Sequence, residues 1–301
     1  MKRVVAVLAI AVAASPALAD RPSHRPEAFE LDRDAPPPGQ AELGFDGGAP
    51  IENYALSAQL GFLDRPMRLH TVDIKVFPVD QRETLALGGA IALGPSVIAD
   101  IRMPFSHQSG TRWQRIGDDT PLDAWVLGDL GLGVRLRLAR RGAATIFARA
   151  QLTLPTGDDY DFAGDARYSA AWMLIGRFQL PAGIVLAGSA GVRFRGREIL
   201  VADRLVGDEL TGAIGATYEL PAVPGLWCPA NHVRVTAEVV GVLGNDVAGE
   251  RGPSPLEGRR GLVSRIRPWV AIAGRVGKGL DDHIGAPRFR ATLELVFEPG
   301  A

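Results

Sequence analysis

The stretch at residues 126–139 reads VLGDLGLGVRLRLA, and it decides the fold. One alternating set of its side chains is apolar: Val126, Leu130, Leu132, Val134, Leu136 and Leu138. The opposite set is charged or tiny: Asp129, Gly131, Gly133, Arg135 and Arg137. Because successive side chains of a strand point to opposite faces, this pattern predicts a strand with one apolar face and one polar face.

The same alternation recurs along the chain, in residues 144–154, 168–180, 184–195, 209–220, 232–243 and 288–297. Each apolar face persists for about 10 to 13 residues, which suits a tilted strand crossing a hydrocarbon layer, whereas strands of soluble proteins usually run for about 5 to 6 residues. Neighbouring strands with apolar outer faces need a closed sheet, because closure leaves no unpaired backbone edge in lipid. The sequence therefore predicts an all-β fold, an antiparallel transmembrane β-barrel.

The connections between these segments alternate in length, as outer-membrane barrels require. Short turns are predicted at residues 94–95, 140–142 and 181–183, and long loops at 105–124, 156–166, 196–206 and 244–255. The stretch at 221–230 falls on the short side but is too long for a tight turn. With both termini on the same side, the count is about twelve strands, within a range of 10–14. Fourteen strands would require residues 41–45 and 67–77 to be independent strands.

The chain begins with a predicted secretory signal peptide at residues 1–19. Lys2 and Arg3 precede an apolar run, and Ala17-Leu18-Ala19 forms a small-residue cleavage site before Asp20. Residues 20–52 are rich in proline and are expected to form a periplasmic tail or a plug, because proline cannot join the interior of a sheet. Residues 53–301 are assigned to the barrel. These features predict export to the outer membrane of a Gram-negative-type envelope.

The inward face of the predicted strands carries a set of charged residues in which arginine outnumbers acid. The candidate lumen residues are Asp129, Arg135, Arg137, Arg149, Arg177, Arg193, Arg195, Arg234, Glu238, Arg288, Arg290 and Glu294. One interpretation is a polar pore whose positive wall favours anions. The other is that these charges pair across neighbouring strands and fill a narrow lumen. The sequence leaves both open.

Other chemistry finds little support in the residues. His107 and Ser106 lack a third oriented partner for catalysis, so no catalytic residues are predicted and the protein is not expected to be an enzyme. The lone Cys228 cannot form an intramolecular disulfide. No metal site and no cofactor are predicted. A formal net charge of −1 gives no electrostatic reason to expect nucleic acid as a partner.

Several short runs resemble a known family. Gly128-Asp129-Leu130, the run at residues 154–158 (LPTGD), and residues 275–280 (RVGKGL) with 284–290 (IGAPRFR) are similar to outer-membrane barrels of the phenol-degradation MetA-pathway type, including those found ahead of OmpA-type periplasmic domains. The resemblance covers residues 54 to 301. It implies an outer-membrane protein with a transport role and carries no catalytic residues across.

Three functions follow as expectations. The leading one is a passive outer-membrane channel or transporter for small molecules, with anionic or amphipathic solutes favoured. Its rival is a structural or surface-interaction barrel with a filled lumen and no transport, and a soluble β-protein is third. The expected partners are outer-membrane lipid, a small-molecule solute and the barrel-assembly machinery.

Overall fold

The computed structural model describes residues 54–66, 69–70, 75–76, 78–111, 120–158, 163–164, 167–196, 199–201, 204–220, 233–244, 255–267, 269–280 and 286–298. The predicted signal peptide at residues 1–19 and the proline-rich segment at 20–52 lie outside these residues. Within the described part of the chain, no helix combines the length and the apolar character needed to cross a membrane.

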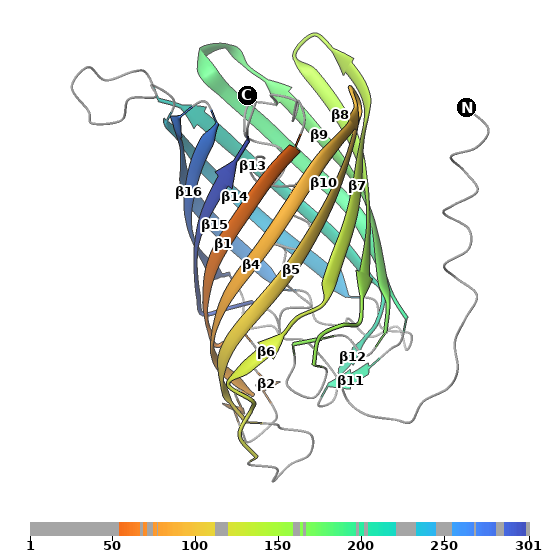
Figure 1. The fold of residues 1–301 in the computed structure, drawn as a ribbon, viewed down its shortest axis with the longest axis vertical. Helices are drawn as coiled ribbons and strands as arrows, with labels where there is room; N and C mark the ends of the chain where they lie inside the picture. The colour runs from red at the N-terminus through yellow and green to blue at the C-terminus, as the bar shows by residue number, and fades with distance from the viewer. Residues whose placement is uncertain are drawn as a thin grey trace.

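Twelve long antiparallel strands close into a barrel (Figure 1). They are β1 (Tyr54–Asp64), β4 (Val79–Gly94), β5 (Val97–Gly110), β7 (Leu130–Arg141), β8 (Ala144–Leu154), β9 (Ser169–Gln179), β10 (Ile184–Arg195), β13 (Glu209–Glu219), β14 (Val233–Gly244), β15 (Leu256–Arg267), β16 (Val270–Gly279) and β17 (Phe289–Phe297). Each strand pairs with its neighbours in the sequence, and β1 closes the ring by pairing with both β4 and β17. The predicted fold class and the strand count are confirmed.

The two ends of the barrel differ in their connections. At the short-turn end, uppermost in Figure 1, β4 meets β5 at residues 94–97, β7 meets β8 at 141–144, and the 3-10 turn η5 (Pro181–Gly183) joins β9 to β10. The opposite end, here called the long-loop end, carries five short strands: β6 (Trp125–Leu127), the β11–β12 pair (Ile199–Val201 and Arg204–Val206), and the β2–β3 pair (Leu69–His70 and Lys75–Val76). The predicted short turns are confirmed; residues 221–232 are not described.

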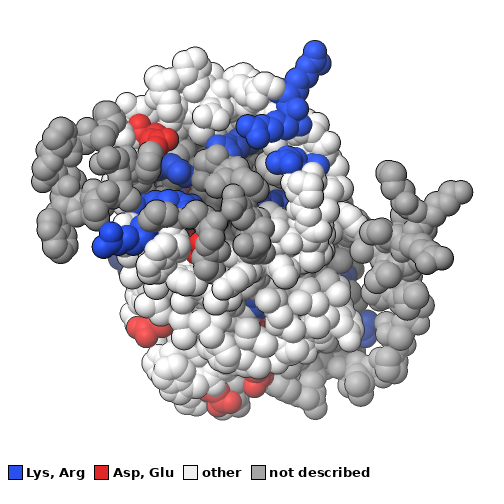
Figure 2. All heavy atoms as spheres, turned by 45° about the horizontal axis from the view of Figure 1, so that its top comes forward, with Lys and Arg blue, Asp and Glu red and all other residues white. Residues whose placement is uncertain are grey.

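The alternation in the sequence translates into an apolar outer surface and a polar lumen. On β7, Leu132, Val134 and Leu136 are 36%, 45% and 40% exposed, whereas the alternating Arg135 is 3% exposed. Figure 2 shows that the outer surface along the strands is largely uncharged, with arginines gathered around the short-turn end. Arg260 and Lys278 are exceptions, because both are exposed at outward positions of β15 and β16.

The predicted position of Val126 is wrong. Val126 was expected to share the apolar face of Leu132, but it is 8% exposed and lies on the inner side, while Trp125 on the same short strand is 77% exposed. The cause is a break in the strand at Gly128 and Asp129, which separates β6 from β7. There the backbone N–H of Gly128 donates to the carbonyl of Pro104 at 2.9 Å, and the alternation restarts in the opposite phase.

The ends of two strands have local causes. β5 continues to Gly110, beyond the start of the long loop expected at residue 105, because Ser106 and Gln108 extend its buried alternating face. β1 ends at Asp64, where Arg65 adopts φ 48° ahead of Pro66. The described residues of the segment at 67–77 form the short β2–β3 pair outside the barrel sheet; residues 41–45 lie outside the described chain.

Exposed aromatic side chains form a belt at each end of the barrel, although aromatic residues make up 7% of the chain. The long-loop end carries Phe105, Trp125, Tyr168, Phe194 and Phe289, and the short-turn end carries Tyr54, Phe178, Tyr218, Trp269 and Phe297. Aromatic rings at these two levels are typical of the interfaces between a membrane and water.

Candidate functional site in the barrel lumen

The charged side chains inside the barrel divide it into two walls. The positive wall is formed by β4, β5, β7, β8 and β9, whose inward charged positions are Arg82, Arg102, Arg135, Arg137, Arg149, Arg177 and Asp100. The balanced wall is formed by β10 and β13–β17, whose inward charged positions are Arg193, Arg195, Arg234, Arg259, Arg265, Arg275, Arg290, Glu209, Glu219, Glu238, Glu257 and Glu294, followed by Glu298. The inward residues of β1 between the two walls are uncharged.

On the positive wall, an ion pair reaches across an intervening strand. Arg149 Nη2 on β8 lies 3.1 Å from Asp100 Oδ1 on β5, and the two side chains are 5% and 8% exposed. Gly133 of β7 lies between them, and a Cβ built there would be 2.5 Å from each carboxylate oxygen of Asp100. Glycine at this position therefore makes room for the pair, which explains a tiny residue within an otherwise regular strand.

Three other arginines of the positive wall make contacts with uncharged groups. Arg102 Nη2 donates to Gln59 Oε1 at 2.7 Å. Arg82 is fully buried and donates to Gln108 Oε1. The guanidinium carbon of Arg135 lies 5.2 Å from the ring centre of Phe147 on the neighbouring strand, within the range of a cation–π interaction. These contacts orient the guanidinium groups and leave their charge in place.

On the balanced wall, Glu257 joins two arginines. Its Oε1 lies 3.1 Å from Arg259 Nε and 2.9 Å from Arg290 Nε, and all three side chains are 5% exposed or less. Arg290 also donates through Nη2 to Glu257 Oε2 at 3.2 Å. The pair with Arg290 spans β16 at Gly277, where an added Cβ would overlap Glu257 Oε1. Both walls thus use a glycine on the middle strand to let an acid reach an arginine two strands away.

Four further acids of the balanced wall have arginine partners, and one of them, Glu238, has its Oε1 3.7 Å from Arg259 Nη1. Glu209 accepts from Arg193 at 3.3 Å and from Arg195 at 2.9 Å, on adjacent strands. Glu294 lies 3.2 Å from Arg275 on the neighbouring strand. Near the short-turn end, Glu298 and Arg265 are 2.9 Å apart. The carboxylates offset much of the arginine charge on this wall.

Each of these ion pairs lies within one strand or joins strands that are adjacent or two apart in the sheet. The side chains are therefore held along their own wall, and none of these pairs connects opposite sides of the barrel. Within the described residues, no group of three or more histidine, cysteine, aspartate or glutamate side chains could hold a metal ion. Chemically, the arrangement offers fixed guanidinium donors along a polar passage.

Most of the residues chosen from the sequence occupy inward positions of the strands. They are Arg135, Arg137, Arg149, Arg177, Arg193, Arg195, Arg234, Glu238, Arg290 and Glu294. Asp129 lies in the break before β7, where its Oδ1 accepts the backbone N–H of Gly157 at 2.8 Å and fixes the turn after β8. Arg288 precedes β17; its side chain is 61% exposed, and its Nε lies 3.8 Å from Asp64 Oδ2 at the rim.

The sequence analysis missed several charged lumen residues: Arg82, Asp100, Arg102, Glu209, Glu257, Arg259 and Arg275. Period-two alternation could have found Asp100 and Arg102, which alternate with Ile101. The adjacent arginines Arg259 and Arg260 obscure the pattern on β15, because the second of them points outward.

Comparison with known proteins places the fold. The structure is similar to a COG4313 outer membrane channel from Pseudomonas putida F1, with a TM-score of 0.60 and 15% identity over 89% of this chain and 98% of that chain. It is also similar to the NanC porin, with a TM-score of 0.51 and 6% identity over 80% of this chain and 98% of that chain. No family model matches the sequence, and no curated protein matches it. These likenesses show the fold, which is that of an outer-membrane β-barrel.

Proposed function

We propose that the protein is an outer-membrane channel for small solutes and that the positive wall makes it prefer anions. In this arrangement the short-turn end faces the periplasm and the long loops face outward, as is usual for such barrels. The observation that carries the proposal is the unequal division of charge between the two walls. Among the described inward positions of the positive wall there are six arginines and one acid, Asp100. Fixed positive charge in a confined passage raises the local concentration of anions.

The direction of the ion pairs supports an open passage. Twelve strands about 4.8 Å apart and tilted by about 40° enclose a backbone radius of about 12 Å. A guanidinium held against its own wall by a neighbouring carboxylate or amide does not cross the axis of such a barrel. Small inward residues, such as Gly131, Ala213 and Gly215, widen the passage where no long side chain stands.

Arg149 illustrates how the positive wall can receive an anion. Its Nη2 is occupied by Asp100 at 3.1 Å. Its Nε and Nη1 are buried and make no hydrogen bond with the described residues. Buried donors of this kind need an acceptor, and charge-assisted bonds from guanidinium to an oxyanion are among the stronger ones.

A filled structural barrel is a second candidate, and the burial of the lumen favours it. Arg135, Arg149, Arg193 and Arg290 are each 5% exposed or less. Small barrels fill their interior with side chains, and such a barrel would serve a structural or surface role without transport.

Planar bilayers separate the two candidates. The mature protein is reconstituted with potassium chloride at different concentrations on the two sides, and the reversal potential is measured. We expect stepwise conductance. The reversal potential should have the sign of the chloride equilibrium potential, which shows that chloride permeates better than potassium. Protein whose folding is verified by heat-modifiable migration, but which leaves the bilayer silent across a range of salt concentrations, would support the filled barrel.

The placement in a membrane has its own test. Leu132→Arg puts a charge on the outer face of β7 and is expected to cost about 2 to 4 kcal/mol near the middle of the bilayer. The matched variant Leu132→Met keeps the surface apolar and should assemble as the unchanged protein does. The measurement is the yield of heat-modifiable barrel in the membrane fraction. A protein that purifies without detergent and tolerates Leu132→Arg would overturn the proposed contact with outer-membrane lipid and the need for the barrel-assembly machinery.

A further inference from the structure

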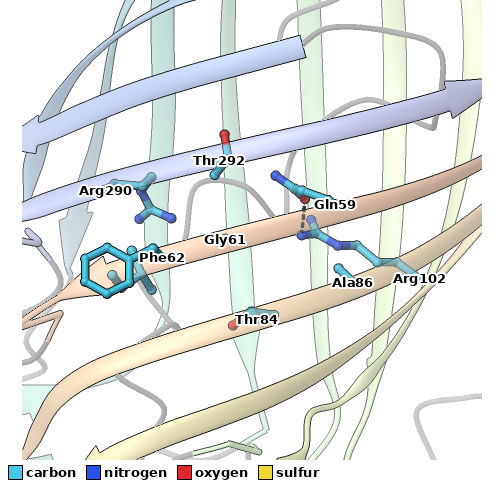
Figure 3. Close-up of a pocket in the computed structure, with 9 residues that line it drawn as sticks. Gln59, Gly61, Phe62, Thr84, Ala86, Arg102, Arg290 and Thr292 are labelled. Atoms are coloured by element: carbon cyan, nitrogen blue, oxygen red, sulfur yellow. Dashed lines mark hydrogen bonds between the residues drawn. The ribbon is translucent and has the colours of Figure 1, made fainter. Parts of the chain in front are cut away.

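A recess opens in the lumen where the two walls meet at β1. β1, β4, β5 and β17 all contribute to its lining. Figure 3 shows Arg102 and Arg290 on opposite sides of Gly61. Because four strands contribute to its lining, the recess is larger than a gap between two neighbouring side chains.

The charged side chains that line the recess are both arginines, and no carboxylate lines it. Arg102 is oriented by its bond to Gln59 Oε1 at 2.7 Å (Figure 3). Arg290 is fixed from the other side by Glu257, which engages its Nε and Nη2. Two guanidinium groups held in place by groups behind or beside them form a preorganised site for a negative charge.

An unsatisfied hydroxyl in the same recess points to a ligand. Thr292 is 8% exposed, and its Oγ1 makes no hydrogen bond with the part of the chain that the structure describes. By contrast, the hydroxyl of Thr84, which also lines the recess, is 2.9 Å from Ser106 Oγ. A buried hydroxyl without a partner is uncommon in proteins, and it is explained when a bound group supplies the missing acceptor.

The remaining lining is apolar and has space at its centre. Leu63 and Ala86 are each 3% exposed. Gly61 contributes no side chain, and a Cβ built there would meet its nearest neighbour, the carbonyl oxygen of Thr84, at 3.8 Å. A ligand with an apolar portion would contact these groups, whereas an inorganic anion would leave them uncovered.

We propose that this recess binds a small organic carboxylate. The carboxylate accepts hydrogen bonds from the guanidinium groups and from Thr292, and a short apolar chain packs against Leu63 and Ala86. The proposal rests on the proposed function, because it names the class of anion that the channel would carry. The recess is then a binding site that the solute occupies while it crosses the channel.

Calorimetric titration of the folded mature protein in detergent micelles tests the site without requiring transport. Butyrate is the probe, with acetate and inorganic phosphate as comparisons. We expect saturable binding of butyrate, weaker binding of acetate because it has less apolar surface, and weaker binding of phosphate. Absence of saturable butyrate binding, or equal binding of all three anions, would overturn the proposal.

Two variants and one control locate the binding. Gly61→Leu keeps both arginines and fills the recess, so it should abolish butyrate binding. Thr292→Val removes one hydroxyl at nearly constant volume and should weaken binding by about threefold to tenfold. Gly274→Ala, on β16, is the control, because a Cβ there has no neighbour within 4 Å. Binding that survives Gly61→Leu in a barrel with normal heat-modifiable migration would place the carboxylate elsewhere.

Bilayer recordings then separate this proposal from the proposed function. Butyrate binding by a protein that leaves bilayers silent would refute the channel and retain the site. Anion conductance by a protein that does not bind butyrate would retain the channel and refute the site. In a conducting protein with the site, butyrate should reduce the chloride current, and Gly61→Leu should remove this inhibition.

Discussion

The two walls of the lumen carry comparable numbers of arginines but surround them with different partners. On the balanced wall, Glu209, Glu257 and Glu294 meet arginines at 2.9–3.3 Å. On the positive wall, Arg102 meets an amide and Arg135 meets an aromatic ring. An amide or a ring can hold a guanidinium in place without cancelling its charge. The difference shows how one barrel can hold lumen arginines in place on both walls and still keep a net positive charge on one of them.

The largest expected effect comes from the most heavily paired acid of the balanced wall. Glu257→Gln leaves Arg259 and Arg290 without the buried carboxylate that joins them, and loss of one partner of a buried ion pair costs about 3 to 5 kcal/mol. Urea titration in micelles, followed by tryptophan fluorescence, measures the free energy of unfolding. Glu83→Gln is the control, since the Glu83 side chain is 68% exposed, and it should change stability by less than about 0.5 kcal/mol. Equal stability of both variants would show that this wall does not depend on its ion pairs.

The next prediction tests a feature that both walls share, a glycine that makes room for an ion pair between the strands on either side of it. Gly133→Ala on the positive wall and Gly277→Ala on the balanced wall each place a Cβ against the carboxylate that crosses the glycine. We expect each to lower the free energy of unfolding by about 1 to 3 kcal/mol, the usual cost of overpacking. Gly176→Ala is the control, because a Cβ there has no neighbour within 4 Å. If one glycine tolerates alanine and the other does not, the crossing pairs differ in rigidity, and the comparison of the walls must include packing as well as charge.

Much of this architecture could be predicted from the sequence, because a barrel wall repeats one local rule. Alternation of apolar and polar residues determines which face of a strand meets lipid, so residues such as Leu132 and Arg135 could be placed without a structure. The rule failed at Val126, where a break in the strand reversed the phase. Such a break depends on contacts with distant segments, among them the bond from Gly128 to Pro104.

The division into two walls could not be predicted in the same way. Alternation shows that a side chain points inward, but it does not show which strand lies beside it or at what height. The pairing of Arg149 with Asp100 depends on the register of three strands and on the space at Gly133. Similarly, Glu257 and Arg290 are 33 residues apart and meet because β16 carries a glycine between them. An excess of arginine was visible in the sequence, whereas its concentration on one side required the closed barrel.

A smaller effect should follow from reducing the charge of the positive wall. Arg102→Gln combined with Arg135→Gln removes two positive charges, one in contact with the Gln59 amide and one with the Phe147 ring. The chloride-to-potassium permeability ratio should fall by about threefold to tenfold at low salt. Reversal potentials measure the ratio. The difference from the unchanged protein should shrink at 1 M salt, where the Debye length is only about 3 Å. An unchanged ratio at low salt would mean that these arginines do not face the conducting path.

The smallest effect is expected from removing a complete ion pair of the balanced wall. Arg275→Gln combined with Glu294→Gln deletes one positive and one negative charge that lie 3.2 Å apart. The net charge is unchanged, and the paired charges produce little field beyond their own neighbourhood, so the permeability ratio should change by less than about twofold. Stability should change by no more than about 1 kcal/mol, because the pair's attraction is largely offset by the cost of its desolvation. Reversal potentials and urea titration on the same preparation measure both quantities. Glu294→Gln alone is the informative companion, because it exposes the charge of Arg275 and should raise anion preference. If the double variant shifted selectivity as strongly as the loss of Arg102 and Arg135, the division into a positive and a balanced wall would not describe the path that ions take.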